Sequence, residues 1–201
     1  MIETETSRAK RLKAATQGVH QGLDEAVMAA RPFESRARYA EFLRMQQIFH
    51  RDVAALYKNE ALTALIPDLA ARRRYDAVIA DLGDLEAEPG VESDSPVFED
   101  QIADIPTALG WLYVAEGSNL GAAFLLKAAA GLGLSEAFGA RHLAASPDGR
   151  ANHWRSFTAA LDAAEMTQAQ EDRATAGATA AFARVRALVE AHLGPDQSAA
   201  A

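Results

Sequence analysis

Apolar residues recur every three or four positions along most of this 201-residue chain, which is the spacing of one face of an α-helix. The clearest example begins after Ser35, a favourable N-cap residue, and ends near Leu56. Its core-facing side comprises Tyr39, Phe42, Leu43, Gln46, Phe49, Val53 and Leu56. Helices that each carry an apolar stripe bury it by packing on one another. The sequence therefore predicts an all-α protein.

Further helices are expected on both sides of this segment. A first helix covers about residues 8–30 and stops at Arg31-Pro32, and a third is opened by Pro67 and ends before Pro89-Gly90. After an acidic loop over residues 88–104, helix resumes at Asp104 or Thr107, and two more surround Trp154 and residues 182–192. The length suits one core, so we expect a single domain over residues 1–201 with frayed tails at 1–7 and 194–201.

Charge and cysteine content exclude several classes of function. The net charge of -8 argues against a nucleic-acid binder, and the absence of cysteine excludes disulfides, iron–sulfur clusters and thiolate metal sites. Any metal must be held by histidine or carboxylate. The N-terminus is polar and acidic, and the apolar region 105–134 is interrupted by Glu116 and Lys127. We expect a cytoplasmic protein without a membrane segment.

His20 is the most informative of the five histidines. Asp24 follows it by four residues, so the two side chains meet on one helix face. A carboxylate there can orient an imidazole whose other nitrogen binds a metal. The spacing is equally typical of an ordinary surface pair, so it leaves both interpretations open.

A second notable segment, residues 110–123, is apolar and helical, and Gly117 and Gly121 are expected to interrupt the helix. Each glycine in a helix interior costs about 1 kcal/mol relative to alanine. Close packing of another helix on the bare backbone is one explanation, and the spacing alone slightly favours it. The alternative is a kinked helix that lies across a flat ligand, with the glycines leaving room for it.

The two segments together resemble bacterial haem oxygenases. Residues 12–33, with Thr16 and the run His20-Gln21-Gly22-Leu23-Asp24, are similar to the proximal helix of that family, and residues 110–123 are similar to its distal helix. Blocks 56–62 and 138–144 extend the likeness over residues 8–192. The resemblance implies a single-domain helical bundle that holds haem b between the two helices. Haem would be both substrate and cofactor, with His20 as the axial iron ligand, and would yield biliverdin, CO and ferrous iron.

The resemblance also implies residue roles. Asp24 would orient His20. Three residues of the second segment, Gly117, Ser118 and Gly121, would lie over the haem. Arg74 would belong to a distal water network. Arg72 and Arg73 are interpreted as a solvated helix face that could serve reductase docking, and Glu116 as solvent-facing. No role is assigned to His50, His142, His153 or His192.

The haem propionates decide which meso carbon is opened. Lys13 and Tyr113 match the Lys and Tyr that hold the propionates in α-selective relatives. Relatives that make other isomers place lysines where this chain has Met28 and Ala128. The resemblance therefore predicts biliverdin IXα.

The sequence also bears on the electron donor, the acceptor of the product and two alternative functions. No flavin or iron–sulfur motif is present, so electrons must come from a separate ferredoxin or flavin reductase, and the biliverdin could pass to an acceptor such as a phytochrome or be a by-product of iron acquisition. A ferritin-like di-iron protein needs Glu-x-x-His motifs, and the chain has none. A haem sensor or carrier without turnover, built on the same fold, is the alternative that the sequence leaves open.

Overall fold

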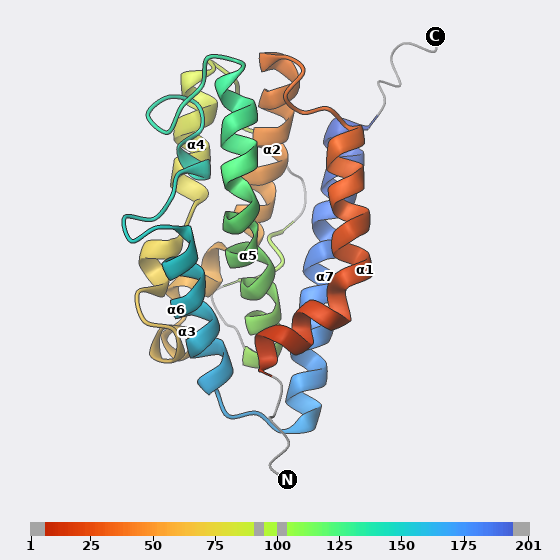
Figure 1. Cartoon of the computed structure of the whole chain (residues 1–201), viewed down its shortest axis with the longest axis vertical. Helices are drawn as coiled ribbons and strands as arrows, with labels where there is room; N and C mark the ends of the chain where they lie inside the picture. Colours follow the sequence, from red (N-terminus) through yellow and green to blue (C-terminus); the bar gives the residue numbers. More distant parts are fainter. Residues whose placement is uncertain (1–6, 91–94, 100–103, 195–201) are drawn as a thin grey trace.

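The computed structural model describes residues 7–90, 95–99 and 104–194, and within these ranges the chain is helical and has no β-strand. The expected all-α class is confirmed. Four long helices, α1, α2, α5 and α7, run roughly in the direction of the long axis of the molecule, and α3 and α6 both lie toward its lower end in Figure 1. The elements are α1 (Arg8–Ala29), α2 (Arg36–Asp52), η1 (Ala54–Lys58), α3 (Glu60–Leu65), η2 (Leu69–Arg72), α4 (Tyr75–Asp84), α5 (Ile105–Ala130), η3 (Arg141–Leu143), α6 (Arg150–Ala163) and α7 (Gln168–Leu193).

The first two helices begin at serine caps. Ser35 Oγ accepts from the Arg38 amide, as expected from the sequence. Ser7, which the sequence placed in a frayed tail, instead caps α1 by accepting from the amide of Lys10. The remaining residues of the two expected tails, apart from Gly194 directly after α7, lie outside the described ranges.

The expectation of one continuous third helix that starts at Pro67 is wrong, both in where the helix starts and in its continuity. Pro67 does not open a helix, because Asp68 takes a left-handed conformation with φ of 59°. A 3-10 turn, η2, follows, and α4 starts only at Tyr75. The periodicity also missed the short helix α3, which Asn59 caps by accepting from the Leu62 amide. These breaks let η1 and η2 pack beside the middle of α5, where Tyr57 and Arg72 both contact Glu116.

The crossing of α5 and α7 forms the centre of the bundle, and it depends on two glycines. A Cβ on Gly110 would lie 2.1 Å from the Ala174 carbonyl oxygen, and one on Gly177 would lie 2.4 Å from that of Thr107. No side chain fits there, so these are the residues that let two backbones approach. α7 also contacts α1 and α2, and thus joins the long helices.

α5 itself is one continuous helix, and Gly117 and Gly121 do not end it. The expected interruption of the helix at these two residues is therefore wrong. Among the described residues no helix combines the length and the apolar character needed to cross a membrane.

Candidate functional site

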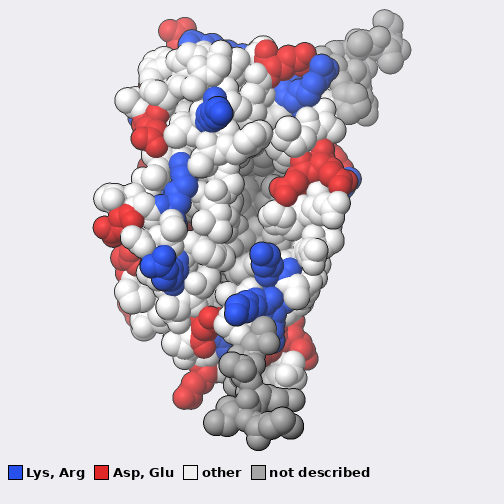
Figure 2. All heavy atoms as spheres, viewed as in Figure 1, with Lys and Arg blue, Asp and Glu red and all other residues white. Residues whose placement is uncertain are grey.

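A hollow lies between α1 and α5 on the face shown in Figure 2. α7 packs against both helices. Both helices expose large apolar side chains: Val19 of α1 is 42% exposed, and Leu120 and Phe124 of α5 are 46% and 62% exposed. α1 has no buried residue after Thr16, although its later turns are rich in apolar residues. Apolar surface beside a hollow is typical of a binding site for an apolar ligand.

His20 projects from the exposed part of α1, with 58% of its side chain accessible. Its Nδ1 lies 3.1 Å from Asp24 Oδ2, as the four-residue spacing predicts. Its ring packs edge-on against Phe182 of α7, with the ring centres 5.4 Å apart. Because Nδ1 faces the carboxylate, Nε2 is the nitrogen left for a metal. The pair has the geometry of an oriented metal ligand.

Gly117 and Gly121 share one face of α5 with Tyr113, since the three residues are spaced by four. A Cβ on Gly121 would have no atom within 4 Å, and one on Gly117 would meet only the Trp154 ring, at 3.6 Å. No helix backbone packs on either residue, so the close-packing explanation is wrong for this pair. The bare backbone at Gly121 is open to a flat molecule, and the described residues fit a haem.

The two residues expected at the propionates differ in their surroundings. Lys13 is exposed on α1, about two helical turns before His20. Tyr113 is half-buried, and burial raises the pKa of its hydroxyl. None of the hydrogen bonds found among the described residues involves that hydroxyl. Ser118 is also exposed, but its hydroxyl donates to the Ala115 carbonyl at 2.7 Å and is thereby tied to its own helix.

The expectation that Glu116 and Arg72 face solvent is wrong, because both side chains are buried. Each side chain is 1% exposed, and Arg72 Nη1 donates to Glu116 Oε2 at 3.1 Å. Tyr57 donates its hydroxyl to the other carboxylate oxygen at 3.0 Å, and burial followed by the charge of Glu116 raises the pKa of that tyrosine. The cluster joins η1, η2 and α5 directly beside Gly117. Arg73 is partly exposed and pairs with Asp76, as a surface residue does.

Arg74 is half-buried at the N-terminus of α4. Burial lowers the pKa of its guanidinium, while the charges of Glu116 and Tyr57 oppose that shift. The structure therefore brings Arg74 into the electrostatic environment of the α5 segment that carries Gly117. Its expected part in a water network stays a prediction.

Two buried histidines were given no role by the sequence. His142 Nδ1 lies 2.8 Å from Asp81 Oδ2, and His142 Nε2 and His50 Nδ1 are buried without a hydrogen-bond partner among the described residues. Burial, followed by the charges of His142 and Arg74, lowers the pKa of His50 to about 3. Buried polar atoms of this kind are usually satisfied by internal water. The sequence offered no signal for them, because their surroundings come from α2, α4 and η3.

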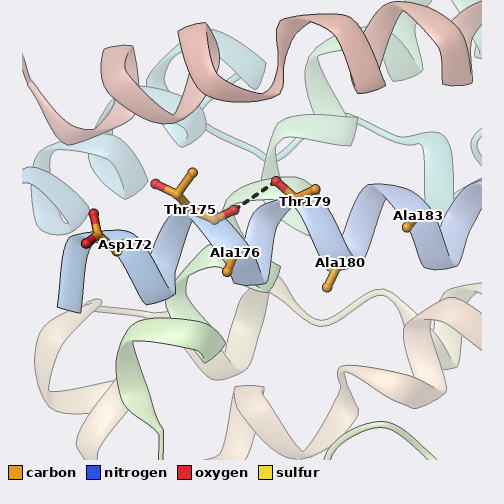
Figure 3. A pocket seen from close by; sticks show the side chains of 6 residues that line it. All are labelled: Asp172, Thr175, Ala176, Thr179, Ala180 and Ala183. Carbon is orange, nitrogen blue, oxygen red and sulfur yellow. Dashed lines mark hydrogen bonds between the residues drawn. The ribbon is translucent and has the colours of Figure 1, made fainter. Parts of the chain in front are cut away.

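A second, shallow hollow lies on α7, as Figure 3 shows. Its polar groups are one carboxylate, of Asp172, and two threonine hydroxyls, of which Thr179 Oγ1 already donates to the Thr175 carbonyl. None of its lining residues is a histidine or a glycine. The hollow between α1 and α5 is therefore the candidate site.

Comparison with known proteins shows which family the chain belongs to. Residues 6–191 match the family model described as Heme oxygenase. The chain is 48% identical, over 91% of each sequence, to a protein named heme oxygenase PigA from Pseudomonas aeruginosa.

Two solved structures show the same fold. A structure of NO- and CO-bound haem oxygenase from Neisseria meningitidis is similar with a TM-score of 0.88 and 43% identity, over 95% of this chain and 94% of that one. Haem oxygenase 2 from Chlamydomonas reinhardtii, solved without haem, matches with a TM-score of 0.70 and 18% identity, over 96% of this chain and 100% of that one, which shows the fold alone. The family model, which matches most of the chain, and the relative that is 48% identical show that the chain belongs to the haem oxygenase family of haem-degrading oxidoreductases.

Proposed function

We propose that this enzyme seats haem b between α1 and α5, binds its iron through His20 and opens it to biliverdin IXα. The observation that carries the proposal is that α1 carries His20 with Nε2 left free and α5 carries Gly121 with a bare backbone, and that a hollow lies between these two helices. Haem supplies the redox-active iron and is also the molecule that is consumed. A histidine ligand suits this use, because it donates less electron density to iron than a thiolate does.

Asp24 supports the ligand role of His20. By facing Nδ1, the carboxylate favours the tautomer that carries its proton there, and it fixes the ring orientation together with Phe182. Both side chains are more than half exposed in this structure. A bound haem would cover apolar surface near His20 and exclude water from it.

Tyr113 and Lys13 are proposed to hold the propionates. The Tyr113 hydroxyl is partly desolvated and has no hydrogen bond to the protein among the described residues, so it is available as a donor to an anion. Lys13 adds a positive charge two turns from His20. Together they select the edge of the haem, and we propose the α isomer on that basis.

The reaction also needs O2 and electrons, and membership of the family implies a separate reductase. We propose a ferredoxin or a flavin reductase as the donor. Biliverdin of the α type suits an acceptor such as a phytochrome, and iron release suits iron acquisition. The cytoplasmic location stays a prediction.

One experiment tests the proposal. Hemin added to the purified protein should give a Soret band, and reductant with O2 should replace it by the spectrum of biliverdin, identified as IXα by chromatography. His20→Ala should lose normal iron ligation and turnover, while His192→Ala, a partly exposed histidine of α7, should retain both. A stable Soret band without bilin would identify a haem carrier instead, and wild-type ligation in His20→Ala would remove His20 as the ligand.

A further inference from the structure

Trp154 of α6 contacts two of the residues assigned to the haem site. Its Cη2 and Cζ3 atoms lie 3.6 and 3.7 Å from the point where a Cβ of Gly117 would stand. Its ring centre is 5.6 Å from that of Tyr113, and it stacks on the buried ring of Phe157. The sequence gave Trp154 no part in the site, because α6 is far from α5 along the chain.

The position of Trp154 is fixed by the buried cluster described above. Its neighbour His153 places Nε2 3.2 Å from Glu116 Oε2, without the alignment of a hydrogen bond. The His153 carbonyl accepts from Arg72 at 3.2 Å, and Arg72 also donates to Ser156. The first turns of α6 are therefore anchored to α5 at Glu116 and Gly117, and Trp154 cannot move away without breaking buried contacts.

The contact with Tyr113 matters because no hydrogen bond among the described residues holds the Tyr113 side chain. Packing against the Trp154 ring, together with the hydrophobic core, limits its rotation. Trp154 also covers the backbone at Gly117, whereas one turn further on Gly121 has no atom within 4 Å of a Cβ position. The uncovered stretch of the α5 backbone therefore stops at Gly117, where the Trp154 ring covers it.

We infer that Trp154 is a positioning residue that sets how far the haem enters the hollow and where Tyr113 presents its hydroxyl, and thereby which meso carbon is opened. The inference rests on the proposed function of Tyr113 as a propionate donor. Trp154 does not act on the reacting atoms itself. It acts through Tyr113 and through the space that it fills beside Gly117.

The test compares Trp154→Ala and Trp154→Phe with Trp111→Phe. Trp111 is the other tryptophan of the chain, and it packs against Phe49 and Phe98. Proton NMR of the haem methyl groups in the cyanide-bound ferric complex reports how the haem is seated without any turnover. Chromatography of the bilin reports the meso carbon, and circular dichroism on heating reports folding.

We expect Trp154→Ala to give a second set of haem methyl signals and to raise the share of minor bilin isomers roughly tenfold, the scale of one lost contact in a specificity pocket. Trp154→Phe should be intermediate and Trp111→Phe should match the wild type. A folded Trp154→Ala with the wild-type methyl signals and isomer ratio would overturn the inference. If Trp154→Ala fails to fold, Trp154→Leu decides in the same way. Failure of the proposed function is separate, since it would show as no biliverdin, or a non-α product, from the wild type.

Discussion

Arg72 Nη1 donates to Glu116 Oε2 at 3.1 Å, and both side chains are 1% exposed. This buried ion pair ties η2 to the residue just before Gly117, and thus connects the fold to the proposed haem site. Two charges in the core are stable only together, because each alone would stay desolvated without a partner.

Removal of one member of this pair should therefore destabilise the protein strongly. We expect Arg72→Met to lower the free energy of unfolding by about 3–5 kcal/mol, measured by urea denaturation of the haem-free protein. Arg73→Met, which removes a partly exposed arginine paired with Asp76, should cost less than about 1 kcal/mol.

The energetic coupling between Arg72 and Glu116 can be checked with a second substitution. Glu116→Gln in the Arg72→Met background should recover part of the loss, because the amide carries no charge and can still accept from Tyr57. Equal losses in the two arginine variants would show that the pair contributes no more than a surface contact.

Alanine substitutions at Gly110 and Gly121 of α5 should have different effects on stability and on hemin binding. Gly110→Ala would place a Cβ 2.1 Å from the Ala174 carbonyl oxygen, so we expect a loss of about 3 kcal/mol or more in unfolding free energy. Gly121→Ala meets no atom within 4 Å and should stabilise the haem-free protein by up to about 1 kcal/mol.

The same Gly121→Ala variant should bind hemin more weakly and turn it over more slowly, because the methyl group occupies space proposed for the haem. Urea denaturation and hemin titration of both variants measure the two effects. Wild-type hemin affinity and turnover in Gly121→Ala would contradict the proposed seat of the haem on α5.

Local features of the site could be predicted from the sequence. The contact of His20 with Asp24 follows from a four-residue spacing within one helix, and the start of α2 at Ser35 follows from its capping chemistry. Three long helices, α1, α2 and α5, follow from apolar periodicity in the same way, whereas the last helix was expected only around residues 182–192 and α7 begins at Gln168. Each of these depends on residues that are neighbours along the chain.

Features that depend on tertiary packing could not be predicted. Arg72 stands in a run of three arginines that is typical of a solvated face, and it is buried because its partner lies 44 residues further on. Gly110 and Gly121 have the same intrinsic free-energy cost in a helix interior, but Gly110 faces α7 and Gly121 faces open space. What lies opposite a residue is decided by distant segments, so spacing alone favoured the wrong explanation for Gly117 and Gly121.

His50 should make the stability of the protein depend on pH. An unfolded histidine takes up a proton near pH 6.5, whereas burial, with the charges of His142 and Arg74, lowers the pKa of His50 to about 3. Between these values the unfolded state binds more protons, so stability falls as the pH drops below about 6.5. His50→Leu should remove about 2 kcal/mol of the loss between pH 7 and pH 5, measured by urea denaturation of the haem-free protein. Equal losses with and without His50 would show that the folded protein protonates this side chain.

Lys13 and Tyr113 should determine the product isomer through separate contacts. In Tyr113→Phe the ring still packs on Trp154 but the hydroxyl is lost, and in Lys13→Ala a charge is lost from the exposed face of α1. We expect each variant to bind hemin and to form biliverdin with a raised share of non-α isomers, and the double variant to shift further, because either contact alone still biases the propionate edge. Lys58→Ala, an exposed lysine of η1, serves as the charge-matched control and should keep the wild-type ratio. Chromatography of the bilin isomers measures all four proteins, and an unchanged ratio in the double variant would show that the haem edge is selected elsewhere in the site.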